Sequence, residues 1–440
     1  MRNLAVLAPP KFLLLTPWIF SPTPPPGNDP QVGPATQLLL QRSAGPEGSS
    51  TVLVVAGASD RFSRRVQESL LAADVSSRAF HVRDEPTVET VSEIAREAEG
   101  CGAAAIVAVG GGAAIDAAKA AAALLGNGGA SANAYDFLPA PEGRGLPFAR
   151  LPLPLLAVPT TASSGAEASS LAVLAFGGDA DDASLAQPPC VLASAALAPA
   201  AALVDPELAY GTPAGLTSAG GVAALARCLD AYAFGSELAR PVALAGVALA
   251  VRGLHNAARG ADSGVEDEQA RADLAHAALY SGLSGGGALG AAEALGRVLG
   301  AALGAPHAAA VAAVAPLCAY ATLKRARDAV VDFDIKDCTA EELLMARYKA
   351  LAETLSGQEE ATEADGVGLF FDLAAALPLT PLREMGLTPD MAPDIAERAM
   401  ATGQMGALTE QDLRLLLKAS LFTPLTAEER QMVDDEAPFA

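Results

Sequence analysis

The chain has 440 residues, more than one typical hydrophobic core holds, so its length predicts two domains. Hydrophobic residues make up 51% of the sequence and charged residues 18%, a composition that argues against an intrinsically disordered chain. The net charge of −22 and the lack of any lysine- or arginine-rich run argue against a nucleic-acid partner, because phosphate backbones are bound by clustered basic side chains. No uninterrupted apolar stretch of about 18 residues occurs, so we expect no membrane partner.

Cysteine usage and the first residues bear on the compartment. The five cysteines lie far apart, form no CxxC pair and match no zinc spacing, which favours a reduced, cytoplasmic protein. Residues 1–20 are apolar but contain Pro9, Pro10, Lys11 and Pro17. We expect an N-terminal strand there, and a signal or organellar transit peptide is the alternative.

The first half of the chain alternates strands with helices. Short apolar runs predict buried parallel strands at residues 51–55, 77–82, 104–109 and 155–158. Helical periodicity predicts helices at residues 61–73, 88–99 and from the glycines after Val109 to Leu125. This alternation is typical of a parallel α/β sheet.

The second half has a different character. Beyond Asp205 and Pro206 the sequence consists of long alanine- and leucine-rich segments with few β-branched runs. Helices are predicted at residues 217–233, 241–258, 269–281, 288–303, 308–325 and 341–355. We therefore expect an α/β domain at residues 1–205 and an all-helical domain at residues 206–440.

Three glycines, Gly110, Gly111 and Gly112, join the third strand to the helix after it. Glycine lets the backbone approach a ligand closely, and the free N–H groups at the start of a helix bind anions. The run therefore predicts a cradle for a pyrophosphate. It is neither a G-x-G-x-x-G fingerprint nor a Walker A loop, so a purely structural turn is the alternative.

Hydroxyl side chains follow the fourth strand, beginning with Thr160 and Thr161. Hydroxyls at the carboxyl end of a parallel strand can bind ribose or phosphate, because open α/β sheets bind ligands at that edge. A Ser/Thr-rich turn that caps a helix is the alternative.

Together these segments resemble the iron-containing (group III) alcohol dehydrogenases and the glycerol dehydrogenases related to them. That family carries GGGS-x-x-D-x-AK and PTTAGTGSE, where this chain has GGGAAIDAAK and PTTASSGAE. The likeness continues in order through residues 85–87, 202–208, 216–232, 306–307 and 408–421. It implies the fold of that family, which is also dehydroquinate synthase-like: an α/β nucleotide-binding domain, a helical domain and a cleft between them.

The resemblance implies NAD or NADP as cofactor, bound along Gly110, Gly111, Gly112, Thr160 and Thr161. Two further residues, Asp116 and Lys119, match the family's motif positions. Gly57 stands where the family has an acidic residue that receives the adenosine ribose. Without that carboxylate, and with arginines at 61, 64 and 65, NADP becomes at least as good a candidate as NAD. A solvated helix face is the alternative role for the arginines.

Family members bind a divalent metal, such as iron or zinc, through one Asp and three His. The motifs place Ala223 at the Asp position and Arg227, Glu293 and His307 at the His positions. An alanine methyl cannot ligate a metal, and a guanidinium repels a cation. We therefore expect a degenerate metal site, in which His307 and Glu293 are the only candidate ligands.

The resemblance implies an oxidoreductase that moves hydride between the nicotinamide and a small alcohol, carbonyl or oxo-acid, in a homodimer or larger assembly. Arg227, Arg297 and His307 are the candidate catalytic residues, because cations aimed at the substrate oxygen can replace part of a metal's effect. Arginines would also suit a carboxylate-bearing substrate, such as the oxo-acid of the family's metal-free maleylacetate reductases. Two alternatives stand: Arg227 and Glu293 form an ion pair that only fills space, or the whole chain is a non-catalytic descendant that keeps the fold.

Overall fold

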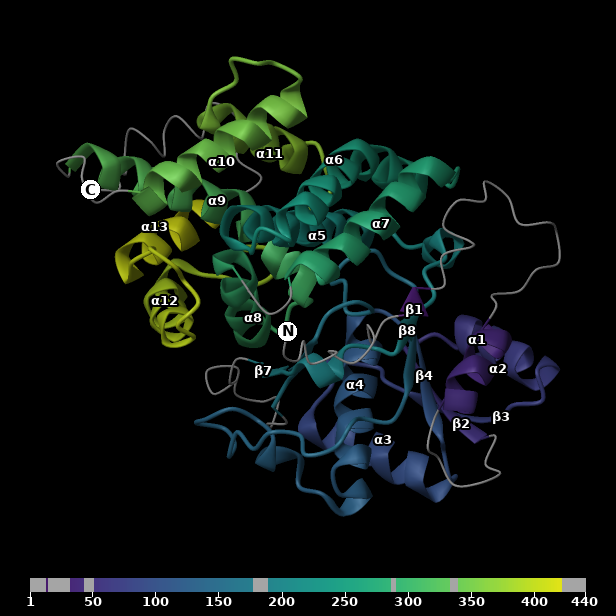
Figure 1. Cartoon of the computed structure of the whole chain (residues 1–440). Coiled ribbons are helices and arrows are strands. Elements are labelled where there is room, and N and C mark those ends of the chain that lie inside the picture. The colour runs from purple at the N-terminus through teal and green to yellow at the C-terminus, as the bar shows by residue number, and fades with distance from the viewer. Residues whose placement is uncertain are drawn as a thin grey trace, which may run out of the picture. The chain divides into compact units, whose positions relative to one another are not determined.

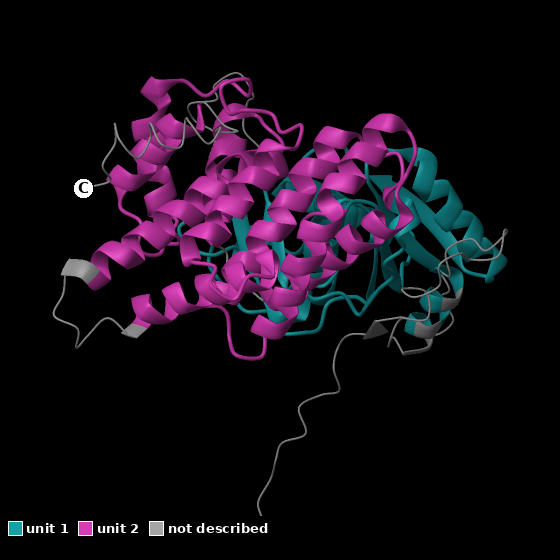
Figure 2. Ribbon diagram, turned by 90° about the horizontal axis from the view of Figure 1, so that it is seen from above, with its two compact units in different colours: residues 1–161, 166–177, 190–208 teal, residues 162–165, 178–189, 209–440 magenta. Residues whose placement is uncertain are grey.

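The computed structural model describes residues 13–14, 32–42, 51–176, 189–285, 290–332 and 339–421 (Figure 1). Within these ranges the chain divides into two compact units (Figure 2). The first covers residues 1–161, 166–177 and 190–208, and the second covers residues 162–165, 178–189 and 209–440. The first unit holds a parallel sheet and the second is helical, so the predicted fold class is confirmed.

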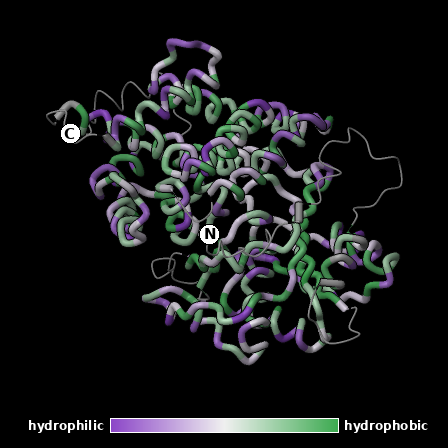
Figure 3. The backbone as a smooth tube through the Cα atoms, in the orientation of Figure 1, coloured by the Kyte–Doolittle hydropathy of each residue, from purple (hydrophilic) through white to green (hydrophobic). Residues whose placement is uncertain are grey.

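Six parallel strands form the sheet of the first unit, in the order β1-β8-β5-β4-β2-β3. Their bounds are β1 Leu13–Leu14, β2 Thr51–Ala56, β3 Ser76–His81, β4 Ala105–Gly110, β5 Leu155–Pro159 and β8 Ala201–Ala202. The continuous apolar runs of β2 and β4 are buried and appear in the colours of hydrophobic residues in Figure 3. In register, Ala56 pairs with Val109, and Gly110 pairs with Pro159. The carboxyl ends of β2, β4 and β5 therefore meet at one edge.

Four helices belong to the first unit: α1 Val32–Arg42, α2 Asp60–Ala72, α3 Val88–Gly100 and α4 Gly112–Gly126. Side-chain caps fix where two of them begin, since Ser59 accepts the N–H of Arg61 and Thr87 accepts the N–H of Thr90. Helix α4 is alanine-rich and buried over most of its length, which lets it pack closely on the sheet. A two-stranded antiparallel sheet of β6 (Leu171–Leu174) and β7 (Cys190–Ala193) completes the unit and was not predicted.

Nine helices are described in the second unit. They are α5 Ala214–Phe234, α6 Arg240–Ser263, α7 Glu268–Gly285, α8 Ala291–Leu303, α9 His307–Asp332, α10 Thr339–Ser356, α11 Glu363–Ala375, α12 Ala392–Ala401 and α13 Glu410–Ser420. The first six confirm the predicted helices, with boundaries displaced by a few residues. The last three were not predicted, although α11 and α13 each begin with a Thr–Asp capping box.

Small residues let the central helix α5 pack against α6 and α7. A Cβ atom placed on Gly221 would lie 2.4 Å from Cδ1 of Leu254 on α6, so a larger residue would clash with that side chain. By length and composition, residues 307–330 of α9 could also cross a membrane, but 61% of that window is buried, as in the core helix of a folded domain.

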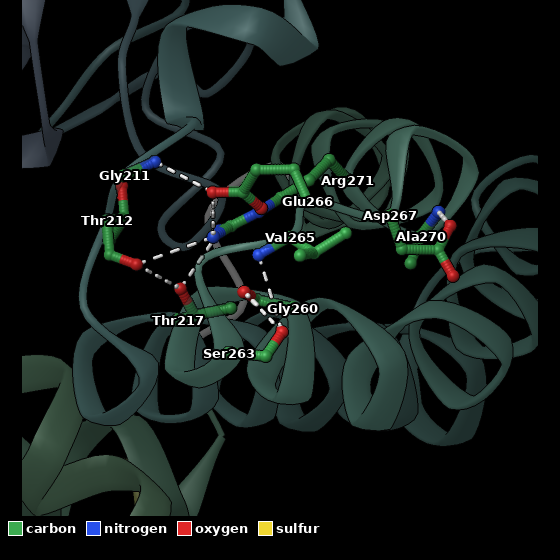
Figure 4. Close-up of polar contacts among 10 residues, drawn as sticks. All are labelled: Gly211, Thr212, Thr217, Gly260, Ser263, Val265, Glu266, Asp267, Ala270 and Arg271. Atoms are coloured by element: carbon green, nitrogen blue, oxygen red, sulfur yellow. Dashed lines mark hydrogen bonds and ion pairs between the residues drawn. The ribbon is translucent and has the colours of Figure 1, made fainter.

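Arg271 on α7 holds the segment that leads into α5 (Figure 4). Its Nε and Nη2 donate to the carboxylate of Glu266 at 2.7 and 3.1 Å, and its Nη1 donates to Oγ1 of Thr217 at 2.9 Å. Nη2 also donates to the carbonyl of Thr212, while Glu266 accepts the N–H of Gly211. These bonds join the loop before α5, the first turn of α5 and the start of α7.

Several predictions concern residues outside the described ranges. Leu13 and Leu14 confirm a short N-terminal strand, β1, whereas the remainder of residues 1–20 and Cys338 lie outside them. The other four cysteines, at 101, 190, 228 and 318, carry free thiols.

Candidate active site

The glycine turn of the first unit is shaped by close backbone contacts. The N–H of Gly57 donates to the carbonyl of Val109 at 3.0 Å, and the N–H of Thr160 donates to the carbonyl of Gly110 at 2.9 Å. A Cβ atom on Gly110 would lie 3.0 Å from the nitrogen of Gly57, and one on Gly111 would lie 3.2 Å from Oγ1 of Thr161. A side chain on Gly110 would therefore clash with the end of β2, and one on Gly111 would press on the side chain of Thr161.

The N-terminus of α4 opens at this edge. Gly111 is its N-cap and has no side chain to cap the first N–H groups. Helix N-termini carry free N–H groups and a partial positive charge, which stabilise a phosphate. Gly110, Gly111 and Gly112, with Thr161 beside them, therefore leave the start of α4 open to an anion and could hold a pyrophosphate.

Asp116 and Lys119 are buried on α4 and hold β6 against this helix. Nζ of Lys119 donates to Oδ1 of Asp116 at 3.2 Å, to Oγ of Ser169 at 3.0 Å and to the carbonyl of Leu171 at 2.7 Å. Oδ2 of Asp116 accepts the N–H of Val173 at 3.2 Å. The motif pair thus has a packing role, and its predicted role in cofactor binding stays a prediction.

The structure adds a carboxylate near Gly57 that the sequence analysis overlooked. Nδ1 of His81 donates to the carbonyl of Gly57 at 3.0 Å, and Nε2 lies 3.4 Å from Oδ1 of Asp60. Asp60 also pairs with Arg64 at 3.7 Å. The sequence contains a hint of this carboxylate, because Asp60 lies in the first turn of the helix that follows a predicted strand. The end of β2 is therefore not without a carboxylate, which weakens the argument for NADP over NAD.

The four positions that correspond to metal ligands come together in the helical unit. Ala223 and Arg227 lie on α5, Glu293 on α8 and His307 at the start of α9. Nε and Nη2 of Arg227 donate to the two carboxylate oxygens of Glu293 at 2.5 and 2.9 Å. Nε2 of His307 lies 3.0 Å from Oε2 of the same carboxylate. Arg227, Glu293 and His307 therefore meet, and an ion pair forms at positions where the resemblance places metal ligands.

The Ser/Thr-rich segment at residues 162–165 belongs to the same unit. Gly165 has a φ of +63°, and a Cβ atom there would lie 2.4 Å from the carbonyl of Ala278 on α7. Nη1 of Arg227 donates to the carbonyl of Ser164 at 2.8 Å. The guanidinium is therefore held by this segment as well as by Glu293.

The charge of Arg227 keeps Glu293 ionised. Burial alone would raise the pKa of Glu293, but Arg227 and then His307 hold this pKa well below its ordinary value. An ionised carboxylate can only accept, so Nε2 of His307 is the donor in their hydrogen bond. Nδ1 of His307 is buried and has no hydrogen-bond partner among the described residues.

A second carboxyl group, Asp230, lies on α5 one turn beyond Arg227. Burial and the negative charge of Glu293 raise the pKa of Asp230 to about 7, although Arg227 opposes the shift. Its Oδ2 is buried without a hydrogen-bond partner in the described part of the chain. It lies so close to Gly290 that a Cβ atom there would be 1.8 Å away. Asp230 was not among the predicted site residues.

Arg297, the third predicted catalytic residue, lies one turn after Glu293 on α8. Its side chain is buried, and Nη2 donates to Oε1 of Gln404. Gln404 lies between α12 and α13 and was not singled out from the sequence.

These residues do not fit a divalent metal ion. Ala223 offers no donor, both oxygens of Glu293 already accept hydrogen bonds, and Nε2 of His307 is committed to Glu293. Within the described ranges, no group of three or more His, Cys, Asp or Glu side chains could hold a metal. A divalent ion about 4 Å from the guanidinium would be repelled by about 8 kcal/mol at an effective dielectric constant of about 20.

Comparison with known proteins decides the family. The model of iron-containing alcohol dehydrogenases matches residues 33–206, and that of the C-terminal domain of the same family matches residues 217–421. The chain belongs to the iron-containing alcohol dehydrogenase family. It is therefore an oxidoreductase of the alcohol dehydrogenase type.

Relatives and solved structures agree with this family. The chain is 29% identical to choline dehydrogenase of Bacillus subtilis over 343 residues, which cover 77% of this chain and 78% of the relative. It is 29% identical to the NAD-dependent methanol dehydrogenase of Bacillus methanolicus, over 52% of this chain and 55% of that one. The iron-containing alcohol dehydrogenase of Thermococcus thioreducens has the same fold, with a TM-score of 0.71 at 20% identity over 90% of this chain and 97% of that chain. These likenesses do not favour a non-catalytic descendant.

Proposed function

We propose that this family member is an NAD(P)-dependent oxidoreductase acting on a small alcohol and the corresponding aldehyde, ketone or oxo-acid. The observation that carries the proposal is the glycine turn at the N-terminus of α4, where side chains are excluded from Gly110 and Gly111. Such a turn suits a pyrophosphate, because it leaves the N–H groups at the start of α4 without a side-chain cap. The similarity to a relative named as an NAD-dependent dehydrogenase supports the same cofactor.

Gly110, Gly111, Gly112 and Thr161 would hold the pyrophosphate, and Thr160 would adjoin it at the end of β5. When bound, the nicotinamide supplies or accepts the hydride. Gly57 and Asp60 would meet the adenosine ribose. Because a carboxylate favours a free 2′-hydroxyl and repels a 2′-phosphate, Asp60 favours NAD while Gly57 permits NADP.

The chain's own residues would handle the proton and the charge. Oxidation of an alcohol releases a proton from its oxygen, and reduction of a carbonyl requires one. With Nε2 of His307 held by Glu293, Nδ1 is the ring nitrogen that can exchange this proton. Arg227 would stabilise the negative charge that develops on the oxygen, and Arg297 would add a second positive charge to the site.

The test is thermal unfolding of the purified chain with and without NADH or NADPH, followed by an assay of nucleotide oxidation against aldehydes and oxo-acids. We expect at least one nucleotide to raise the melting temperature, because a ligand that binds only the folded state stabilises it. The Gly111→Val variant should lose this shift, because its side chain would enter the cradle. Gly100→Val is the matched control, since a Cβ atom at Gly100 meets nothing within 4 Å. If neither nucleotide moves the melting temperature of the wild type, the proposal is wrong.

A further inference from the structure

The guanidinium of Arg227 is held through all three of its nitrogens. Nε and Nη2 donate to Glu293, and Nη1 donates to the carbonyl of Ser164 at 2.8 Å. Moving the side chain would break several charge-assisted hydrogen bonds at once. The side chain is only 13% exposed, so water can replace few of these bonds. Its positive charge is therefore fixed in one place.

Arg227 and Glu293 depend on each other. Glu293 is 1% exposed, and a buried carboxylate without a partner is strongly destabilising. The resemblance places a neutral histidine at each of these two positions in the family. Here one position has gained a positive charge and the other a negative charge, and the two form a bidentate pair. Through these two changes the chain places the positive charge of its own Arg227 at this site.

The same exchange uses up the atoms that could ligate a metal. Both oxygens of Glu293 accept hydrogen bonds from Arg227, and Oε2 also accepts from His307. Ala223 contributes a buried methyl group at the fourth position. Nδ1 of His307 is the atom of these side chains left without a hydrogen-bond partner in the described part of the chain, and one nitrogen beside a guanidinium is too little to hold a divalent ion.

We propose that Arg227 is a resident cation that takes the place of the family's metal, so that this chain works without a divalent ion. In this role the guanidinium also keeps Glu293 oriented toward His307, and its charge lies beside the ring that would meet the substrate oxygen. The catalytic role of Arg227 rests on the proposed function. The absence of a bound metal does not depend on turnover and can be tested without a substrate.

The experiment measures bound metal. The full chain is dialysed against EDTA, incubated with Zn²⁺ or, without oxygen, with Fe²⁺, desalted and analysed by mass spectrometry of the elements. We expect the wild type to retain far less than one ion per chain. The triple variant Ala223→Asp, Arg227→His, Glu293→His, which restores one Asp and three His, should retain one. Arg252→His is the matched control, because Arg252 makes a similar bidentate pair with Asp273 elsewhere in the unit and should gain no metal.

One ion per chain in the wild type would overturn the proposal. The wild-type measurement stands even if the triple variant does not fold, which circular dichroism would show, and the single variant Arg227→His then tests whether removing the cation raises metal retention. A folded Arg227→His variant or triple variant that retains no more metal than the wild type would also count against the proposal. Melting temperatures with NADH and NADPH, recorded on the same samples, separate the two proposals: a metal-free chain that binds neither nucleotide would refute only the proposed function.

Discussion

Two buried arginine–glutamate pairs in the helical unit have nearly the same geometry and different surroundings. Arg271 pairs with Glu266 through Nε and Nη2, and Arg227 pairs with Glu293 through the same two nitrogens. In the first pair the remaining bonds go to backbone groups of the loop before α5 and to the side chain of Thr217, so together they tie this loop and the first turn of α5 to the start of α7 (Figure 4). The first pair is a structural clamp.

The second pair is surrounded by groups that can exchange protons. Glu293 also bonds the ring of His307, and the neighbouring Asp230 has its pKa raised to about 7. Perturbed carboxyl groups beside a histidine are typical of functional sites, although structural networks also produce them. A bidentate arginine–glutamate pair can therefore serve either as a clamp or as part of a site, and the groups that each pair contacts distinguish the two roles.

The largest expected effect on stability is at the clamp. Replacing Arg271 with alanine leaves Glu266 and the loop before α5 without their partner, so we expect the free energy of unfolding to fall by about 3–5 kcal/mol. Urea unfolding followed by circular dichroism measures this loss. In the control Arg414→Ala, which breaks a pair with Glu410 whose two side chains are 48% and 45% exposed, the loss should stay below about 1 kcal/mol. Similar losses in the two variants would contradict the assignment of a clamp.

A double substitution separates the two roles at the second pair. Replacing Arg227 with Met and Glu293 with Leu removes both charges, and buried ion pairs can often be exchanged for apolar residues at little cost in stability. We expect the melting temperature to change little, while the rate of nucleotide-dependent reduction falls by roughly 10²–10³-fold because the charge at the substrate oxygen is lost. If the double variant keeps its activity, the pair only fills space and the comparison fails.

Asp230 should make stability depend on pH in a direction opposite to that of an ordinary ion-paired carboxylate. Its folded-state pKa of about 7 lies above the unfolded value of about 3.9, so the unfolded chain loses its proton first as the pH rises. Its contribution therefore lowers stability progressively between about pH 4 and pH 7. We expect Asp230→Asn to raise the free energy of unfolding by about 1–3 kcal/mol at pH 8 and to have little effect at pH 4.

Urea unfolding of wild type and Asp230→Asn at both pH values measures this difference. An equal effect of the substitution at pH 4 and pH 8 would show that Asp230 is not held in its protonated form.

Most of the fold could be predicted because its signals are local. The continuous apolar runs of β2 and β4 and the long alanine- and leucine-rich segments of α5 to α10 each indicate their structure without reference to the rest of the chain. The pair β6 and β7 escaped prediction because each strand has only four residues and forms through a partner distant in sequence.

The candidate site divides along similar lines. The family resemblance brought Arg227, Glu293 and His307 into one candidate site, which spacing alone could not do because the three residues lie on three different helices. The burial of Asp230 against Gly290 depends on how α5 packs against the start of α8, which the sequence does not contain locally. The orientation of Lys119 toward β6 escaped prediction because that strand was missed.

The central claim is that this family member keeps a nucleotide cradle and replaces the metal with its own cation. The most direct test uses the chain after dialysis against EDTA. It measures the rate at which this chain oxidises NADH or NADPH with aldehydes and oxo-acids as substrates, with and without added Zn²⁺ or Fe²⁺. We predict a measurable rate that is the same with chelator and with metal. A rate that disappears on chelation and returns with the metal would contradict the claim.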